Sequence, residues 1–105
     1  MESVKQNRIV PRRNLNTLAD GLRTSLGELT LPILRRSVKG FFVVDEEEIV
    51  QAMHFVYERL KVVIEPSSAV ALAPLLRHEA GLVGRRVGVV LTGGNMEWSG
   101  VGHLC

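Results

Sequence analysis

Cysteine is nearly absent from this 105-residue sequence, whose one cysteine is Cys105, the last residue. A single cysteine allows no intramolecular disulfide, and there is neither a Cys-x-x-Cys motif nor Cys/His spacing typical of a metal site. His78 and His103 have no partner at metal-ligand spacing, and His54 falls on a predicted helix face, where a histidine is more often structural than catalytic. We therefore expect no metal site, and a cytoplasmic location by default.

Aromatic residues are also scarce, at 5% of the sequence, and residues 1–24 contain none. Residues 1–40 are nevertheless basic, with eight of the 13 Lys and Arg against three of the 11 Asp and Glu. A nucleic-acid interface would combine basic residues with stacking aromatics or gather them on one helix face. The scarcity of aromatics therefore argues against nucleic-acid binding.

Long apolar runs are missing as well. No run approaches the roughly 18 residues of a membrane helix, and the first residues are polar and basic, without a signal-peptide core. Hydrophobic residues still make up 46% of the sequence, against 23% charged residues. This composition predicts a folded chain with much apolar surface to bury, and no membrane partner.

Three short apolar runs are predicted as strands: 40–44 (GFFVV), 62–64 (VVI) and 87–91. The last is almost continuously apolar, which is typical of a strand covered on both faces. Helical patterns separate these runs, so the predicted fold class is α/β, a partial parallel sheet with covering helices. Three strands are too few for a covered sheet, and we expect it to continue in another chain or in a missing segment.

Two helices are predicted between these strands. Asp45 and Glu48 have capping-box spacing and begin a helix over about 46–60, whose buried face is expected to contain Ile49, Ala52, Met53, Val56 and Leu60. Pro66 begins a second, strongly apolar helix that should be deeply buried. Pro74 lies inside this second pattern and should kink or interrupt it.

The first 40 residues show weaker patterns. Residues 1–16 are expected to form an irregular connecting segment, and residues 17–29 a loop or short helices. Pro32 suits the first turn of a short helix ending near Gly40, with one side formed by Ile33, Leu34 and Val38.

The motif Thr92-Gly93-Gly94-Asn95 directly follows the third predicted strand. Ligands of open parallel sheets bind beyond the carboxyl ends of strands, where glycines let the backbone approach a ring or a phosphate. No helical period follows, so a phosphate cradle at a helix N-terminus is not indicated. Taken alone, this motif is better explained as a glycine turn.

Three segments together favour a functional interpretation. In order and separation, residues 16–23 (NTLADGLR), 64–71 (IEPSSAVA) and 90–95 (VLTGGN) resemble the last third of serine racemases and threonine dehydratases, which are fold-type II enzymes dependent on pyridoxal phosphate. The resemblance covers most of the chain. It implies the C-terminal portion of a fold-type II domain, similar to the β-subunit of tryptophan synthase.

The resemblance also implies roles for single residues. Gly21, Glu65 and Thr92 would line the cofactor ring, together with Gly93 and Gly94, and the Thr92 hydroxyl would hydrogen-bond the pyridine nitrogen. A neutral hydroxyl does not keep that nitrogen protonated as a carboxylate would, so the ring is a weaker electron sink. The implied activity is that of an ammonia-lyase (dehydratase) or racemase acting on L-serine or L-threonine.

Three features of the family are not found before residue 16. The Schiff-base lysine, in a Ser-x-Lys segment, and the Gly-rich phosphate loop both come earlier in the family, as do the acidic metal ligands of serine racemases. Ser3-Val4-Lys5 copies Ser-x-Lys only superficially, because no Arg-Gly-Ala follows it. We therefore expect no catalytic lysine and no metal ligand in this chain.

These considerations predict a fragment that is inactive alone. Residues 1–15 would be a basic connecting segment, 16–95 the C-terminal part of the large cofactor domain and 96–105 a tail. The expected partners are the small amino-acid substrate of the full enzyme and a homo-oligomer or a missing N-terminal half. A non-catalytic interaction module and a truncated reading frame remain as alternatives.

Overall fold

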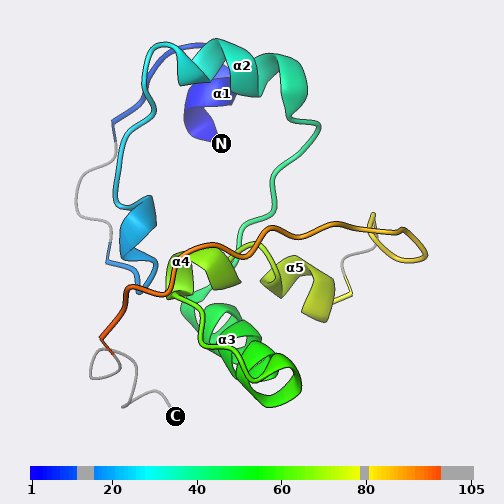
Figure 1. The fold of residues 1–105 in the computed structure, drawn as a ribbon. Coiled ribbons are helices and arrows are strands. Elements are labelled where there is room, and N and C mark those ends of the chain that lie inside the picture. Colours follow the sequence, from blue (N-terminus) through cyan, green and yellow to red (C-terminus); the bar gives the residue numbers. More distant parts are fainter. Residues whose placement is uncertain (12–15, 79–80, 98–105) are drawn as a thin grey trace. The chain divides into compact units, whose positions relative to one another are not determined.

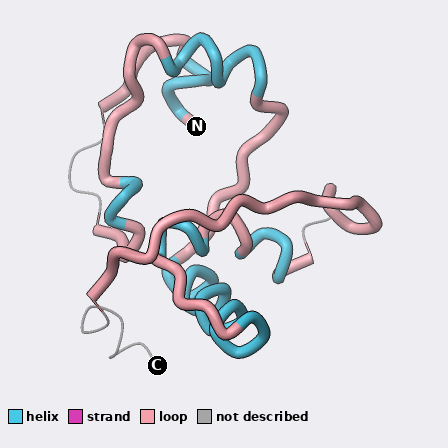
Figure 2. The backbone as a smooth tube through the Cα atoms, in the orientation of Figure 1, coloured by secondary structure: helices cyan, strands magenta, loops and turns pink. Residues whose placement is uncertain are grey.

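In the computed structural model the chain divides into two compact units, which are described separately (Figures 1 and 2). The structure describes residues 1–11, 16–78 and 81–97. Unit 1 comprises Met1–Asn16 and Arg23–Val43, and unit 2 comprises Thr17–Leu22 and Val44–Cys105.

Unit 1 begins with helix α1, Glu2–Gln6, inside the segment expected to be irregular. The helix ends at Asn7, which has the left-handed φ of 54° that asparagine tolerates well. The buried hydroxyl of Ser3 accepts a hydrogen bond from the Val10 N–H at 3.0 Å, which folds the following residues back onto the helix. The sequence missed α1 because a five-residue helix is too short to show an apolar period.

The second helix of unit 1 is α2, Thr30–Ser37, with Pro32 in its first turn as predicted. Leu31 is buried and Leu34 is half-buried on one side of α2. Ile33 was expected on the same side as Leu34, but it is 55% exposed. The Arg35 guanidinium donates a hydrogen bond to Asn7 Oδ1, so the last turn of α2 is tied to the end of α1.

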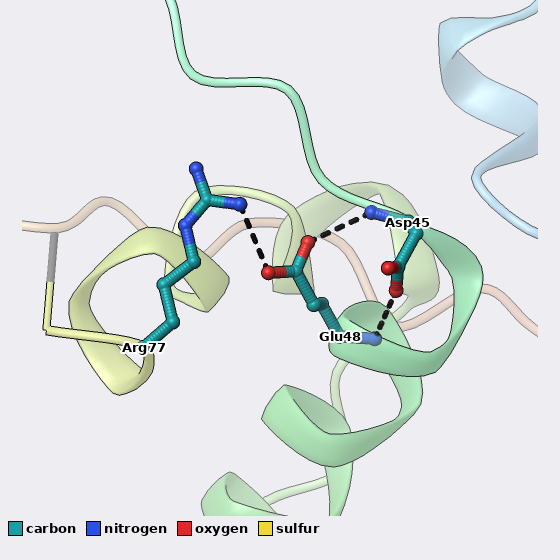
Figure 3. A network of polar contacts seen from close by, with 3 residues as sticks. All are labelled: Asp45, Glu48 and Arg77. Carbon is teal, nitrogen blue, oxygen red and sulfur yellow. Dashed lines mark hydrogen bonds and ion pairs between the residues drawn. The ribbon is translucent and has the colours of Figure 1, made fainter.

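Unit 2 is built on helix α3, Glu46–Leu60, which begins with the predicted capping box. The Asp45 carboxylate accepts a hydrogen bond from the Glu48 N–H at 2.9 Å, and the Glu48 carboxylate accepts one from the Asp45 N–H at 2.8 Å (Figure 3). Glu48 also pairs with Arg77 at 2.9 Å, which links the start of α3 to the end of helix α5, Ala73–Leu76.

The core of unit 2 gathers around one face of α3. Ile49, Ala52, Met53 and Val56 are buried on that face, as predicted. Leu60 was expected there but is 59% exposed, and it is the last residue of α3. The core is completed by four small or apolar residues from other segments, Ala19, Ile64, Ala69 and Ala73.

The predicted second helix of this unit is split in two. Helix α4, Pro66–Ala69, begins with Pro66 at its first position, and α5 has Pro74 in its first turn. Since Pro74 has no N–H to bond the Val70 carbonyl, the first helix cannot continue through it. The interruption expected at Pro74 is therefore confirmed, and both helices contact α3.

Within the described residues no segment is assigned as a strand, so the partial sheet stays a prediction. Figure 2 shows 85–97 as a long segment without helix. A strand is defined by ladder hydrogen bonds to a neighbour, and a single apolar run cannot supply both sides of a ladder. The expected strand residues are largely exposed, at 43% for Val87 and 77% for Val90.

None of the described helices is both long and apolar enough to cross a membrane.

Candidate cofactor site

The first motif segment forms a single 3-10 turn, η1, Asp20–Leu22, held by two side chains of unit 2. The Leu18 N–H donates to Glu46 Oε2 at 2.8 Å, and the Gly21 N–H donates to Ser67 Oγ at 3.0 Å. A Cβ on residue 21 would lie 2.8 Å from that same Oγ. Glycine is therefore needed at position 21 for the close approach of η1 to α4.

The second and third motif segments meet at Glu65 and Gly93. Gly93 has φ of +76°, and a Cβ built there would collide with the Glu65 carboxyl group. The positive φ favours glycine at position 93, since an L side chain is strained there, and an added Cβ would also push aside the end of the flexible Glu65 side chain. The half-buried Glu65 carboxyl thus lies directly against the backbone of the TGGN motif.

Thr92 is fixed through its backbone. Its N–H donates a hydrogen bond to the buried Ser68 Oγ at 2.9 Å, while the residue as a whole is exposed. Figure 1 shows the segment that contains Thr92 running past α4, the helix that carries Ser68. The backbone of Thr92 is therefore anchored to α4.

Gly93 and Gly94 leave the backbone beside Thr92 open. Gly94 is exposed, and the nearest atom to a Cβ built there would be the Val63 carbonyl oxygen at 3.9 Å. Two consecutive glycines beside a hydroxyl let an aromatic ring approach the backbone closely while a hydrogen-bonding group remains at its edge. Among the described residues, no group of three or more His, Cys, Asp or Glu could hold a metal ion.

Of the five residues predicted from the sequence, Glu65 lies against Gly93, Gly21 and Thr92 are hydrogen-bonded to the neighbouring Ser67 and Ser68, and Gly94 lies near Val63. The structure also reveals three supporting residues that the sequence reasoning missed, namely Glu46, Ser67 and Ser68. The two consecutive hydroxyls after Glu65-Pro66 were a signal for two of them. Glu46 gave none, because an acidic residue in a first helical turn is ordinarily explained by the helix dipole.

The family assignment follows from comparison with known proteins. Residues 1–93 match the family model described as pyridoxal-phosphate dependent enzyme, and the chain belongs to that family.

Individual relatives show which members of the family this chain resembles. The chain is 43% identical over 91 residues to the serine racemase of Dictyostelium discoideum, covering 85% of this chain and 28% of the relative. It is 40% identical over 97 residues to the L-threo-3-hydroxyaspartate ammonia-lyase of Saccharomyces cerevisiae, covering 91% and 30%. The chain thus spans less than a third of the length of these curated relatives.

Solved structures share the fold of this chain. The crystal structure of the D. discoideum serine racemase matches with a TM-score of 0.78 at 40% identity, over 91% of this chain and 31% of that one. The structure of maize serine racemase matches with a TM-score of 0.82 at 37% identity, over 98% and 34%. A threonine deaminase crystal structure matches with a TM-score of 0.77 at 39% identity, over 91% and 35%. The resemblance to serine racemases and threonine dehydratases drawn from the three motifs is therefore confirmed.

Proposed function

We propose that this chain forms the ring-nitrogen end of the cofactor site in a pyridoxal-phosphate-dependent ammonia-lyase or racemase acting on L-serine or L-threonine. One observation carries the proposal. Ser67 and Ser68, adjacent on α4, bond the Gly21 and Thr92 N–H groups, so the three motif segments lie in one place. Membership of the family and the names of the relatives agree with this assignment.

In this proposal each site residue has a distinct task. The Thr92 hydroxyl bonds the pyridine nitrogen, while Gly21, Glu65, Gly93 and Gly94 line the ring. The bound cofactor supplies an electron sink for the Cα of the amino acid. Because Thr92 is neutral, it does not hold the nitrogen protonated, and this favours elimination or brief exchange of the α-proton.

The substrates in question share one chemical feature. All three are amino acids with a hydroxyl on Cβ: serine and 3-hydroxyaspartate, which appear in the names of the relatives, and threonine, which the proposal includes. That hydroxyl is the group lost when ammonia-lyase chemistry begins with elimination of water. Serine and threonine are the proposed substrates, and 3-hydroxyaspartate is the first competitor to test.

The wider architecture is also part of the proposal. Residues 16–95 would be the C-terminal part of a fold-type II large domain, with 1–15 as a connecting segment and 96–105 as a tail. Residues 40–44, 62–64 and 87–91 would be strands of a partial parallel sheet that continues outside this chain. The exposure of Val62, Val63, Val87 and Val90 supports this, since the faces of a parallel sheet are covered by helices, and helices outside this chain would cover these side chains.

A chimaeric enzyme tests the function. Residues 1–105 would replace the matching segment of the D. discoideum serine racemase, and racemisation and ammonia release would be measured with L-serine, L-threonine and L-threo-3-hydroxyaspartate. We expect activity with serine or threonine that requires added pyridoxal phosphate. A folded chimaera that binds the cofactor but turns over only 3-hydroxyaspartate would correct the substrate. A folded chimaera that binds no cofactor would favour a non-catalytic interaction module.

A further inference from the structure

The two serines of α4 hydrogen-bond two segments that are distant in the sequence. Ser67 and Ser68 are consecutive, and consecutive helical residues point about 100° apart around the axis. Their hydroxyls therefore reach different neighbours: Ser67 accepts from Gly21 and Ser68 from Thr92, at 3.0 and 2.9 Å. Gly21 and Thr92, which the two serines bond, are 71 residues apart in the sequence (92 minus 21).

We propose that Ser67 and Ser68 form a two-hydroxyl clasp that sets the positions of Gly21 and Thr92 against the cofactor ring. Both hydroxyls act through the backbone N–H groups that they accept, so both serines are positioning residues. The inference rests on the proposed function and deepens it, because it names the groups that orient the ring-nitrogen hydroxyl.

The surroundings of the clasp support a positioning role. Ser68 is only 5% exposed, and the α4 backbone beside it belongs to a helix that packs on the α3 core. Pro66 fixes the first turn of α4, so the two hydroxyls are held on a stiff support. On the Gly21 side, the missing side chain is what admits the Ser67 hydroxyl.

Each half of the clasp predicts a separate change in amide exchange. In Ser68→Ala, the Thr92 amide should exchange roughly five-fold faster, the factor expected for loss of one ordinary hydrogen bond, while the Gly21 amide stays unchanged. Ser67→Ala should give the reverse pattern. Hydrogen exchange of the full chain, read by mass spectrometry over residues 17–23 and 90–95, measures both.

Ser3→Ala is the matched control. Ser3 is also a buried serine, 7% exposed, whose Oγ accepts a backbone N–H at 3.0 Å, but it belongs to unit 1. It should accelerate exchange at Val10 and leave both motif segments unchanged. Equal acceleration at Thr92 in Ser3→Ala and Ser68→Ala would mean general loosening, and would overturn the clasp.

The consequence for the cofactor is measured in the chimaeric holoenzyme. Ser68→Ala should weaken pyridoxal phosphate retention about five-fold and lower kcat, with KM for serine little changed. Ser68→Thr keeps the hydroxyl and should restore retention. If the added methyl unfolds that variant, Ser68→Cys, with its weaker acceptor, should fall between serine and alanine.

The outcomes separate the clasp from the function it serves. Faster Thr92 exchange with unchanged cofactor retention in Ser68→Ala, while Thr92→Ala does weaken retention, would overturn the positioning role. Unchanged exchange in Ser68→Ala would overturn the clasp itself. If Thr92→Ala also leaves retention unchanged, the ring site of the proposed function fails, and with it the positioning role, although the exchange result still shows whether the two hydrogen bonds exist.

Discussion

At the scale of single residues, glycines define the candidate site through two different requirements. Gly93 combines a positive φ of 76° with a close approach to Glu65. Gly84 has a nearly equal φ of 74° but open space around it, and Gly88 has neither feature. The chain therefore contains its own controls for separating backbone strain from steric collision.

Substitution of these three glycines by alanine should give a graded series. Gly88→Ala should be neutral or stabilising by up to about 1 kcal/mol. Gly84→Ala should cost about 1–2 kcal/mol, as expected for a left-handed alanine. Gly93→Ala should cost slightly more, since it must also displace the flexible Glu65 carboxyl group. The midpoint of urea unfolding, followed by helical circular dichroism at low micromolar concentration, measures the series.

A second substitution identifies the source of the additional cost at position 93. In the Glu65→Ala background the carboxyl group is gone, so Gly93→Ala should cost no more than Gly84→Ala. If the two substitutions are simply additive, Glu65 does not press against Gly93, and the packing of these two motifs is wrong.

At the scale of elements, the first turn of α3 holds neighbouring segments through hydrogen bonds and an ion pair. Asp45 caps the helix, Glu48 both closes the capping box and pairs with Arg77, and Glu46 bonds the Leu18 N–H of the first motif. The first turn of one helix thereby holds both the α5 end and the η1 segment.

This arrangement predicts unequal costs for its members. Asp45→Ala should lower the unfolding free energy by about 1 kcal/mol, as expected for loss of an N-cap. Arg77→Met should cost at most about 1 kcal/mol, because the ion pair is partly exposed. A double-mutant cycle of Glu48→Gln and Arg77→Met, by urea unfolding, should give a coupling below about 1 kcal/mol. A larger coupling would show that the pair is more desolvated than its exposure indicates.

The elements also show what sequence patterns could and could not predict. The capping box, α3 and the interruption at Pro74 were predictable because their causes lie within a few neighbouring residues. The exposure of Leu60 was not, because periodicity says which face a residue occupies but not where the packing elements stop. The sheet remains a prediction for the same reason, since a strand depends on partners distant in sequence.

The residues of the candidate site also differ in whether the sequence could predict them. Gly21, Glu65 and the TGGN motif could be proposed from their resemblance to a family. Ser67 and Ser68 stand in the second motif, but their partners could not be predicted, because residue spacing does not indicate which distant backbone N–H a hydroxyl accepts.

At the scale of the whole molecule, apolar side chains remain uncovered. Phe41, Phe42, Val62, Val63, Val87 and Val90 are each at least 41% exposed. Phe41 and Phe42 lie in unit 1 and the four valines in unit 2, and apolar side chains exposed at neighbouring positions often mark an interface or a missing neighbour. Their exposure agrees with a chain that spans less than a third of its relatives' length and, we propose, associates with further family sequence or with another copy.

The isolated chain should therefore self-associate and bind a hydrophobic dye. Analytical ultracentrifugation at increasing concentration should show oligomers, and dye fluorescence should fall when the chain is joined to the rest of a relative in the chimaera. The full-length relative provides the control. A monodisperse monomer with a sharp cooperative melt and no dye binding would show that the apolar runs need no further partner.

Cofactor binding by Thr92 variants of the chimaeric enzyme tests whether Thr92 meets the pyridine nitrogen. Thr92→Ser keeps the hydroxyl and should leave retention and serine dehydration near the parent values. Thr92→Ala leaves the ring nitrogen unpaired and should weaken cofactor binding by about 1–3 kcal/mol. Thr92→Asp places a carboxylate that favours the protonated nitrogen, and should change the absorption spectrum during turnover. If Thr92→Ala and Thr92→Asp both match the parent in retention and spectrum, Thr92 does not face the ring, and the account is contradicted.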